Sequence, residues 1–513
     1  MTYDRKFTLV PVSIADNFLS GALKSETVIE IKMRYFTHFY TVNILWVLFG
    51  CTNPTEIDIE SYKEVIAKSL KFYKAQRSGR LPDNDIPWRS HSALNDRGQN
   101  GEDLSGGYYD ASDYVKFGFT MAFTTTILSW GVISFADGYK AAGQYDDVLD
   151  AVKWATDYFI KCHVSKNELY GQVGDFDIDL KYWGRPEDMN MSRPAYKIDE
   201  EHPGSNLAGQ VAAAFAASSI IFKNINQTYS QELLKHAIEL FNFANQYRGL
   251  YQETIPGAKS FYEDIGYGEE LTWSAIWLYK ATNEGKYLKM AKSFYETYRL
   301  GARPNEFYFN EIAAGIQLLL AEITNNDEFK TAVDSFCSYS IDKQTRTPKG
   351  LVFIDKLGTL SHAANIAFIC LQAVELGLDR RYGEFAKEQI DYMLGKNGRS
   401  YVVGFGKDYP KRPHNAARPH NAASSCPDKP APCGWKQLTT SQVNPQILEG
   451  ALVSGPDLEG ALVSGPDNRD YYEDIREEFL FNDVTLDYNA GFQSALAGLV
   501  MVELARNGTD SNN

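Results

Sequence analysis

The feature that most constrains the fold is a helical apolar periodicity that recurs along most of the chain. From residue 58 onward, about a dozen segments place apolar residues every three or four positions, and loops rich in Gly, Pro and Asn separate them. The segments are 58–76, 119–143, 146–161, 207–222, 230–246, 270–283, 285–298, 310–323, 328–339, 359–376, 380–395 and 487–505. Strand-like alternation is rare, so the sequence predicts an all-α fold. Twelve helices suggest an (α/α)6 barrel of six helical hairpins, with long active-site loops at one end.

No Pro- or Ser-rich linker and no abrupt change of composition divides the chain, although 513 residues exceed the usual size of a single core. We therefore predict one catalytic domain over residues 58–505, followed by a tail at 506–513. The formal net charge of -15 argues against nucleic acid or an anionic membrane as a partner, because both need a basic surface. A neutral polymer such as a polysaccharide remains compatible. We expect no stable protein partner and a monomer.

The region at residues 33–51 resembles a secretory signal. Met33 and Arg34 give a short basic start, an apolar stretch FYTVNILWVLFGC follows at 39–51, and Gly50 stands near a cleavage point. The prediction is a secreted, extracellular protein translated from Met33, with residues 1–32 outside the natural protein or an unusual extension. A membrane anchor through residues 39–51 is the alternative.

Two of the six cysteines are close neighbours in sequence. Cys426 and Cys433 lie in the Pro-rich loop SCPDKPAPC, where a disulfide would hold a turn in an oxidising compartment. Cys162, Cys337 and Cys370 fall in helical patterns and are interpreted as buried thiols.

A pair of carboxylates stands in the run GGYYDASDYVKFGF, at Asp110 and Asp113. Such a pair can direct its oxygens at one water molecule, one residue removing its proton while the other orients it, and the flanking aromatic rings suit the apolar faces of a pyranose. This pattern is typical of a site that cleaves a sugar. Two Asp residues that form turns in a Gly-rich loop are the alternative.

Two exact tandem duplications occur late in the chain. LEGALVSGPD stands at 448–457 and again at 458–467, and RPHNAA stands at 412–417 and again at 418–423. Neither length suggests a solenoid repeat. Both are interpreted as insertions in loops that border the site, where lengthening a loop costs little entropy.

Several motifs in the same order carry a resemblance to a known family. They are GGYYDASDYVKFGF, YKAQRSG at 73–79, YGQVGD at 170–175, WGRPEDM at 183–189, SYVVGFG at 400–406, GALVSGPD and the closing stretch DNRDYYEDIREEFLFNDVTLDYNAGFQSALAGL at 467–499. Together they resemble glycoside hydrolase family 9, the endoglucanases or cellulases, and most closely its secreted animal members. The resemblance implies an (α/α)6 barrel that hydrolyses β-1,4-glucan by inversion, with Asp113 as the general base and Asp110 as its partner in holding the water.

The general acid departs from the family pattern. Where the family has a Glu before Val, this chain has Asp483, whose side chain is one methylene shorter. A carboxyl group misplaced by about 1 Å can cost ~100-fold in rate. Three outcomes are open: slow catalysis through Asp483, substitution by Glu477 or Glu478, or loss of activity with glucan binding retained. Asp474 matches an acidic residue that the family keeps, and it is predicted to support the acid.

The expected sugar contacts are partly lost. The family's PHHR appears here as PHNA twice, so His414 or His420 is the substrate-binding candidate, and the sequence leaves open which of them occupies the site. Trp183, Tyr262 and Tyr488 are the aromatic candidates for substrate binding, with a core position as the alternative for Trp183 and Tyr262.

The resemblance also implies a structural calcium. The matching residues are Gly266, Glu269 and Glu270, with Asn310 where the family has an Asp. Because calcium prefers hard oxygen ligands, an amide in place of a carboxylate predicts a weak site. No cofactor is expected to be required, and no His/Cys cluster has zinc spacing.

Three functions follow for comparison. The first is an endo-β-1,4-glucanase with a weakened acid. The second is a catalytically impaired paralogue that binds β-glucan without efficient hydrolysis, which the lost sugar contacts favour. The third is an exo-acting enzyme, if the duplicated loops close one end of the groove.

Overall fold

The computed structural model describes residues 57–82, 86–110, 113–255, 257–413, 422–458 and 470–510, with side chains as far as residue 507. The N-terminal extension, the signal-like segment, His414, His420 and most of the second LEGALVSGPD copy lie outside the described residues.

In the described part of the chain, six helices form a closed inner ring. Each of them packs against the next, and the last packs against the first. In ring order they are α3 (Gly118–Ala141), α6 (Ser205–Phe222), α10 (Gly268–Thr282), α12 (Ala313–Thr324), α14 (Thr359–Glu375) and α19 (Leu486–Asp510). Their apolar residues face all sides because these helices have neighbours all round.

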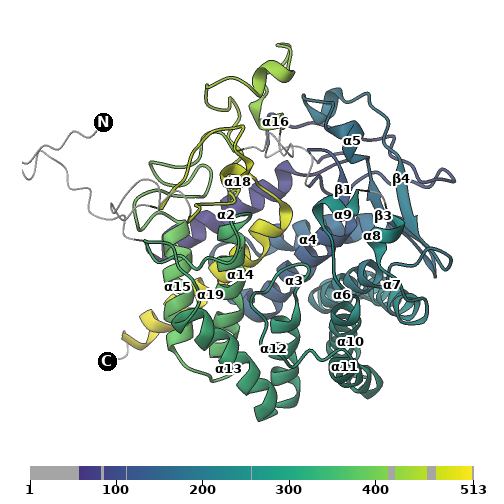
Figure 1. Ribbon diagram of the computed structural model, residues 1–513, viewed down its shortest axis with the longest axis vertical. Helices are drawn as coiled ribbons and strands as arrows, with labels where there is room; N and C mark the ends of the chain where they lie inside the picture. The colour runs from purple at the N-terminus through teal and green to yellow at the C-terminus, as the bar shows by residue number, and fades with distance from the viewer. Residues whose placement is uncertain are drawn as a thin grey trace, which may run out of the picture. The chain divides into compact units, whose positions relative to one another are not determined.

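Each inner helix packs against an outer partner that borders it in sequence, except at the closure, where α2 packs against α19. The outer helices of the described chain are α2 (Ile59–Ala75), α4 (Tyr145–Cys162), α7 (Gln227–Gln246), α11 (Gly285–Thr297), α13 (Asp327–Asp342) and α15 (Arg381–Met393). They bury one face only, as amphipathic helices do. The predicted all-α (α/α)6 barrel is confirmed, and Figure 1 shows the pairing of α10 with α11 and of α14 with α15.

Local capping signals explain why the helices begin and end where they do. Asp58 caps α2 by accepting a hydrogen bond from the Ser61 N–H at 2.8 Å, and Asn226 and Asn326 cap α7 and α13 in the same way. Asn283 and Asn325 end α10 and α12 in the left-handed conformation that Asn tolerates. These signals are short in range, so the sequence alone locates most helix ends.

Two inner helices, α3 and α6, are long and apolar enough to cross a membrane by composition. In the structure, 83% and 89% of their apolar windows are buried inside the barrel, which makes them core helices. Buried indoles of Trp130, Trp273 and Trp277 pack edge to face between α3 and α10.

Shorter elements fill the loops. A small antiparallel sheet consists of β1 (Lys116–Phe117), β2 (His163–Ser165), β3 (Glu168–Val173) and β4 (Ala195–Ile198), with β3 between β1 and β2 and also pairing with β4. The short helices are α5 (Phe176–Asp179), η1 (Pro186–Asp188), α8 (Tyr251–Thr254), α9 (Ala258–Phe261), α16 (Ala422–Ser425), η2 (Trp435–Gln437) and α18 (Phe479–Asn482). Figure 1 shows α5, β1 and α16 in the upper part of the view and α11 and α13 in the lower part, so loop elements gather at one end of the helices.

The cysteines correct one prediction and confirm another. Cys426 and Cys433 form the expected disulfide, and Cys162 is a buried free thiol. Cys337 and Cys370, however, are joined in a second disulfide between α13 and α14, so their interpretation as buried thiols was wrong. Periodicity places each cysteine on a buried helix face, but it does not say that the two faces meet.

Candidate active site

The loop that carries Asp110 and Asp113 is held at its start by a buried cation. The Lys116 ammonium donates to the carbonyl oxygens of Leu104 and Gly106 at 2.6 and 3.0 Å and pairs with Asp96 at 2.8 Å. Gly107 follows with a φ of 74°, and a Cβ there would lie 2.7 Å from the Tyr158 ring. The double glycine of the motif therefore serves both a left-handed turn and a close contact.

Asp110 links the first and last helices of the inner ring. Its Oδ2 accepts a hydrogen bond from the Thr120 hydroxyl of α3 at 2.7 Å, and its Oδ1 accepts from the Leu486 N–H of α19 at 3.1 Å. Burial raises the pKa of Asp110 to about 7, and the negative charge of Asp487 adds to the rise. The carboxyl is fixed on two sides, as a residue that orients a water molecule must be.

Asp113 occupies a left-handed backbone conformation, with a φ of 45°. Asp tolerates this region better than most residues. Its Oδ1 accepts a hydrogen bond from the Ala422 N–H at 2.7 Å. Burial raises the pKa of Asp113 to about 7, and the Ala422 hydrogen bond acts in the opposite direction. A carboxylate with such a pKa can take up a proton near neutral pH.

A cavity of about 280 Å³ is lined in part by Asp483. Asp483 follows α18 directly and is held through its backbone, because its carbonyl oxygen accepts from the Ser454 N–H at 2.8 Å. The cavity is lined by Phe261, Tyr262, Glu306, Tyr308, Phe309, Asn310, Asp355, Leu357, His362, Asp483, Thr485, Asp487 and Tyr488. Aromatic rings and carboxylates thus face one space.

The structure brings some of the predicted site residues together. Asp483, Tyr262 and Tyr488 line the cavity. Burial raises the pKa of Tyr262 well above its ordinary value, and the negative charge of nearby Asp110 adds to the rise. Asp113 lies near the buried cluster that contains Tyr114 and Trp183, and it does not line this cavity.

Other predicted residues lie away from the cavity. Trp183 is only 3% exposed, so most of its surface is covered by protein. Both carboxylate oxygens of Asp474 accept backbone N–H groups, from Lys411 and Arg412 at 2.9 Å. Asp474 therefore fixes the start of the RPHNAA duplication, and its predicted support of the acid stays a prediction. Glu477 and Glu478 do not line the cavity either.

Sequence reasoning missed several residues of the cavity. Asp487 is the first residue of the DYNAGF motif, so a signal for it was present. His362 forms an ion pair with Glu306, Nδ1 to Oε2 at 2.5 Å, and the Tyr308 ring packs on its imidazole. Burial alone would lower the pKa of His362, but the Glu306 carboxylate raises it above its ordinary value. Because Glu306 and His362 stand far apart in sequence, the sequence gave no signal that they pair.

The predicted calcium residues lie around the start of α10. Both carboxylate oxygens of the buried Glu270, and the buried Asn310 Oδ1, have no hydrogen-bond partner among the described residues. Glu269 Oε2 accepts the Ile312 N–H at 2.6 Å, and the N–H of Gly266 donates to Asp264 at 3.4 Å. Burial raises the pKa of Glu270 well above its ordinary value, and the negative charges of Asp264 and Glu269 add to it. No three His, Cys, Asp or Glu side chains within the described ranges are arranged to hold a metal ion.

A barrel of helical hairpins with buried, high-pKa carboxylates beside a cavity lined by carboxylates and aromatic rings defines a glycoside hydrolase. The chain belongs to glycosyl hydrolase family 9, whose model matches residues 62–496. This membership confirms the resemblance drawn from the motifs.

Relatives and solved structures agree. The chain is 41% identical over 466 residues to endoglucanase A of Bacillus pumilus, a match that covers 86% of this chain and 66% of that protein, so the chain spans about two thirds of that relative. The endoglucanase structure of the termite Nasutitermes takasagoensis at pH 2.5 is 53% identical, with a TM-score of 0.82, over 86% of this chain and 99% of that one. The cellulase Cel9M of C. cellulolyticum in complex with cellobiose is 30% identical, with a TM-score of 0.77, over 86% of this chain and 98% of that one.

Proposed function

We propose that the protein is an endo-β-1,4-glucanase, a cellulase that hydrolyses cellulose or related β-1,4-glucans with inversion. The observation that carries the proposal is the arrangement of Asp110, Asp113 and Asp483 in the loops of a family 9 barrel. The endoglucanase names of its relatives and the cellobiose in the Cel9M complex support a β-glucan as the substrate.

In the proposed reaction, Asp113 removes a proton from a water molecule that Asp110 orients, and this water attacks the anomeric carbon. Asp483 protonates the leaving oxygen, while Tyr262 and Tyr488 line the sugar's space. An inverting pair stands ~6.5 to 9.5 Å apart so that the water fits between base and sugar. The missing methylene of Asp483 weakens the acid, because proton transfer needs hydrogen-bond reach.

Reducing-sugar release from carboxymethylcellulose by the purified chain tests the proposal. We expect low activity in the wild type, none in Asp113→Ala, and a rise of ~10- to 100-fold in Asp483→Glu. Glu477→Gln is the matched control and should leave the rate unchanged, because Glu477 is exposed and does not line the cavity. The ¹H NMR spectrum of fresh product should show the α-anomer if the reaction inverts.

Two results would count against hydrolysis. An Asp483→Glu variant that binds glucan but releases no sugar would mean that the site only binds. A β-anomer as first product would rule out inversion while leaving hydrolysis intact.

A calcium ion near Glu270 is part of the same proposal. Glu270 and Asn310 offer buried oxygens that have no hydrogen-bond partner in the described part of the chain, and Glu269 adds a hard carboxylate. The donor chemistry fits calcium, although the side chains are not gathered into a three-ligand group in the described part. Burial raises the pKa of Glu270, the negative charges of Asp264 and Glu269 add to the rise, and a bound cation would act in the opposite direction.

Secretion through residues 33–51 and a monomeric state remain predictions. The two disulfides of the described part support an oxidising compartment.

A further inference from the structure

The proposed base is covered by a loop that carries a disulfide. Ala422, whose N–H donates to Asp113, begins α16, and the Cys426–Cys433 disulfide follows four residues later. The methyl group of Ala422 is buried in a small cluster with Tyr109, Tyr114 and Trp183. The position of this N–H therefore depends on how the loop is attached to the rest of the barrel.

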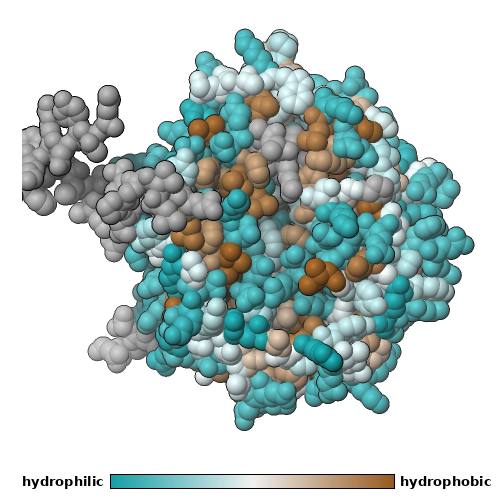
Figure 2. Space-filling model, in the orientation of Figure 1, coloured by the Kyte–Doolittle hydropathy of each residue, from teal (hydrophilic) through white to brown (hydrophobic). Residues whose placement is uncertain are grey.

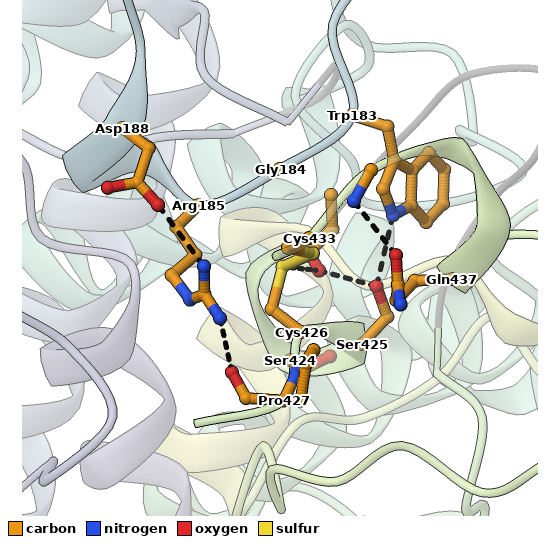
Figure 3. Close-up of a disulfide and its surroundings, with 12 residues drawn as sticks. Trp183, Gly184, Arg185, Asp188, Ser424, Ser425, Cys426, Pro427, Cys433 and Gln437 are labelled. Carbon is orange, nitrogen blue, oxygen red and sulfur yellow. Dashed lines mark hydrogen bonds and ion pairs between the residues drawn. A yellow bond between two sulfur atoms is a disulfide. The ribbon is translucent and has the colours of Figure 1, made fainter. Parts of the chain in front are cut away.

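One attachment is the Trp183 indole. The Ser425 hydroxyl donates to the Ala422 carbonyl oxygen at 2.7 Å and accepts from the Trp183 Nε1–H at 3.1 Å (Figure 3). Ser425 thereby ties the residue that contacts the base to the WGRPED segment.

Arg185 provides the second attachment. Its guanidinium donates to the carbonyl oxygens of Pro427 and Ala431, which both lie in or beside the turn closed by the disulfide. The same guanidinium pairs with Asp188 at 3.2 Å, and Figure 3 shows Arg185 reaching across from the Trp183 segment to Pro427. Because the disulfide closes the turn, the carbonyl groups of Pro427 and Ala431 stay within hydrogen-bonding distance of the Arg185 guanidinium.

The hydrogen bond from the Ala422 N–H affects the ionisation of Asp113. A backbone N–H stabilises the ionised form of a buried carboxylate, so the Ala422 N–H lowers the pKa of Asp113 against the effect of burial. The phenols of Tyr114 and Tyr182 also face Asp113, and burial raises the pKa of both, so they stay neutral. Two acidic residues nearby are neutralised by ion pairs. Glu187 pairs with Arg89, and Asp188 pairs with Arg185 and Lys429.

We propose that the Cys426–Cys433 turn is a positioning element for the general base, which holds the Ala422 N–H on Asp113 through Ser425, Trp183 and Arg185. This inference rests on the proposed role of Asp113 as base. None of the turn's residues needs to touch the substrate for this role. Their effect is exerted through the ionisation of Asp113.

The test is the pH profile of kcat/KM for Cys426→Ser/Cys433→Ser, measured beside the wild type. Loss of the N–H should move the acidic limb to higher pH by about one unit, so that the rate falls ~10-fold at pH 5 but only about twofold at pH 8. The Cys337→Ser/Cys370→Ser variant is the matched control, because it removes the disulfide between α13 and α14 and should leave the limb in place.

A milder variant keeps the test decisive if the double variant does not fold. Ser425→Ala retains the disulfide and removes only the hydroxyl between Ala422 and Trp183, and it should move the limb in the same direction by a smaller amount.

Three results would overturn the inference. The acidic limb could stay in place while the rate falls equally at every pH, which a purely structural role would give. The control could shift as much as the test variant. Activity could rise, which would mean that the turn blocks the base. A wild type inactive at every pH would instead reject the proposed hydrolase function, and the inference with it.

Discussion

At the scale of single residues, the site concentrates carboxylates that are costly to ionise. Burial raises the pKa of both Asp110 and Asp113 to about 7, and Asp487 lies close enough to Asp110 to add to its rise. An unfolded Asp has a pKa of ~3.9. The folded state therefore binds protons on these carboxylates more tightly than the unfolded state does. This proton binding stabilises the fold at low pH, and the stabilisation is lost as the pH rises from about 4 to about 7.

Asp110→Asn should therefore stabilise the barrel at alkaline pH while it lowers activity. The amide can accept from the Leu486 N–H and donate to the Thr120 hydroxyl, so the contacts of Asp110 are kept without its charge. We expect the variant to gain on the order of 2 kcal/mol of unfolding free energy over the wild type at pH 8, and little at pH 4.

Urea unfolding at pH 4, 6 and 8 measures this difference. Asp137→Asn, at an exposed Asp of α3, is the control and should show no such trend. An Asp110→Asn gain that is equal at all three pH values would contradict the assignment of a raised pKa.

The residue scale also shows what a sequence can reveal about a site. Asp110, Asp113 and Asp483 are visible because they stand in motifs whose neighbours are Gly and aromatic residues. One partner of Asp113 is a backbone N–H more than 300 residues away, at Ala422. No residue type marks that contact, since any residue except Pro supplies an N–H.

At the scale of elements, the helices were predictable because their signals are local. The segment expected at 58–76 is α2 (Ile59–Ala75), and its first turn follows the Asp58 cap. The helix expected from residue 310 begins later, at Ala313, because Tyr308 and Glu311 bond to each other through their backbones and Glu269 accepts the Ile312 N–H. The last helix, α19, continues to Asp510, past the expected end at residue 505. Where a helix end is not fixed by a local capping signal, tertiary contacts determine where the helix begins or ends.

The duplicated LEGALVSGPD segment offers an internal control at this scale. In the first copy, the Ser454 hydroxyl accepts from the Gly358 N–H at 2.7 Å, while its backbone holds Leu360 and Asp483. Gly358 has a φ of 74°, and a Cβ there would lie 3.0 Å from the Tyr488 ring, so this junction has little freedom to move.

Ser454→Ala should lower both stability and activity, because it leaves the buried Gly358 N–H without its acceptor. The expected cost is about 1–3 kcal/mol of unfolding free energy, with a fall in kcat from displacement of Asp483. Ser464→Ala, at the same place in the second copy, should be neutral, because the contacts to Gly358, Leu360 and Asp483 are made by the first. Thermal unfolding and glucanase assays of the two variants test this prediction. Equal losses in Ser454→Ala and Ser464→Ala would show that the second copy also supports Gly358 and Asp483.

At the scale of the whole molecule, the barrel closes through contacts between the ends of the described chain. Helix α2 packs on α19, α19 packs on α3, and Asp110 bridges α3 to the start of α19. The loop that carries Asp110 is therefore attached where the ring closes. Figure 2 shows hydrophobic patches interspersed with hydrophilic residues on the face in view.

Calcium should act on the stability of this whole barrel through α10, an inner helix with neighbours on several sides. Binding to the folded state raises the unfolding temperature by mass action. Wild-type protein should therefore melt a few degrees higher in millimolar calcium than in EDTA. Burial and the negative charges of Asp264 and Glu269 make ionisation of Glu270 costly in the folded state without calcium. A Glu270→Gln variant avoids this cost, so it should melt above the wild type in EDTA and should lose the response to calcium. Glu328→Gln, at an exposed position of α13, should respond like the wild type. Differential scanning calorimetry distinguishes the cases: a calcium response retained in Glu270→Gln would place the ion elsewhere, and no response in the wild type would reject the site.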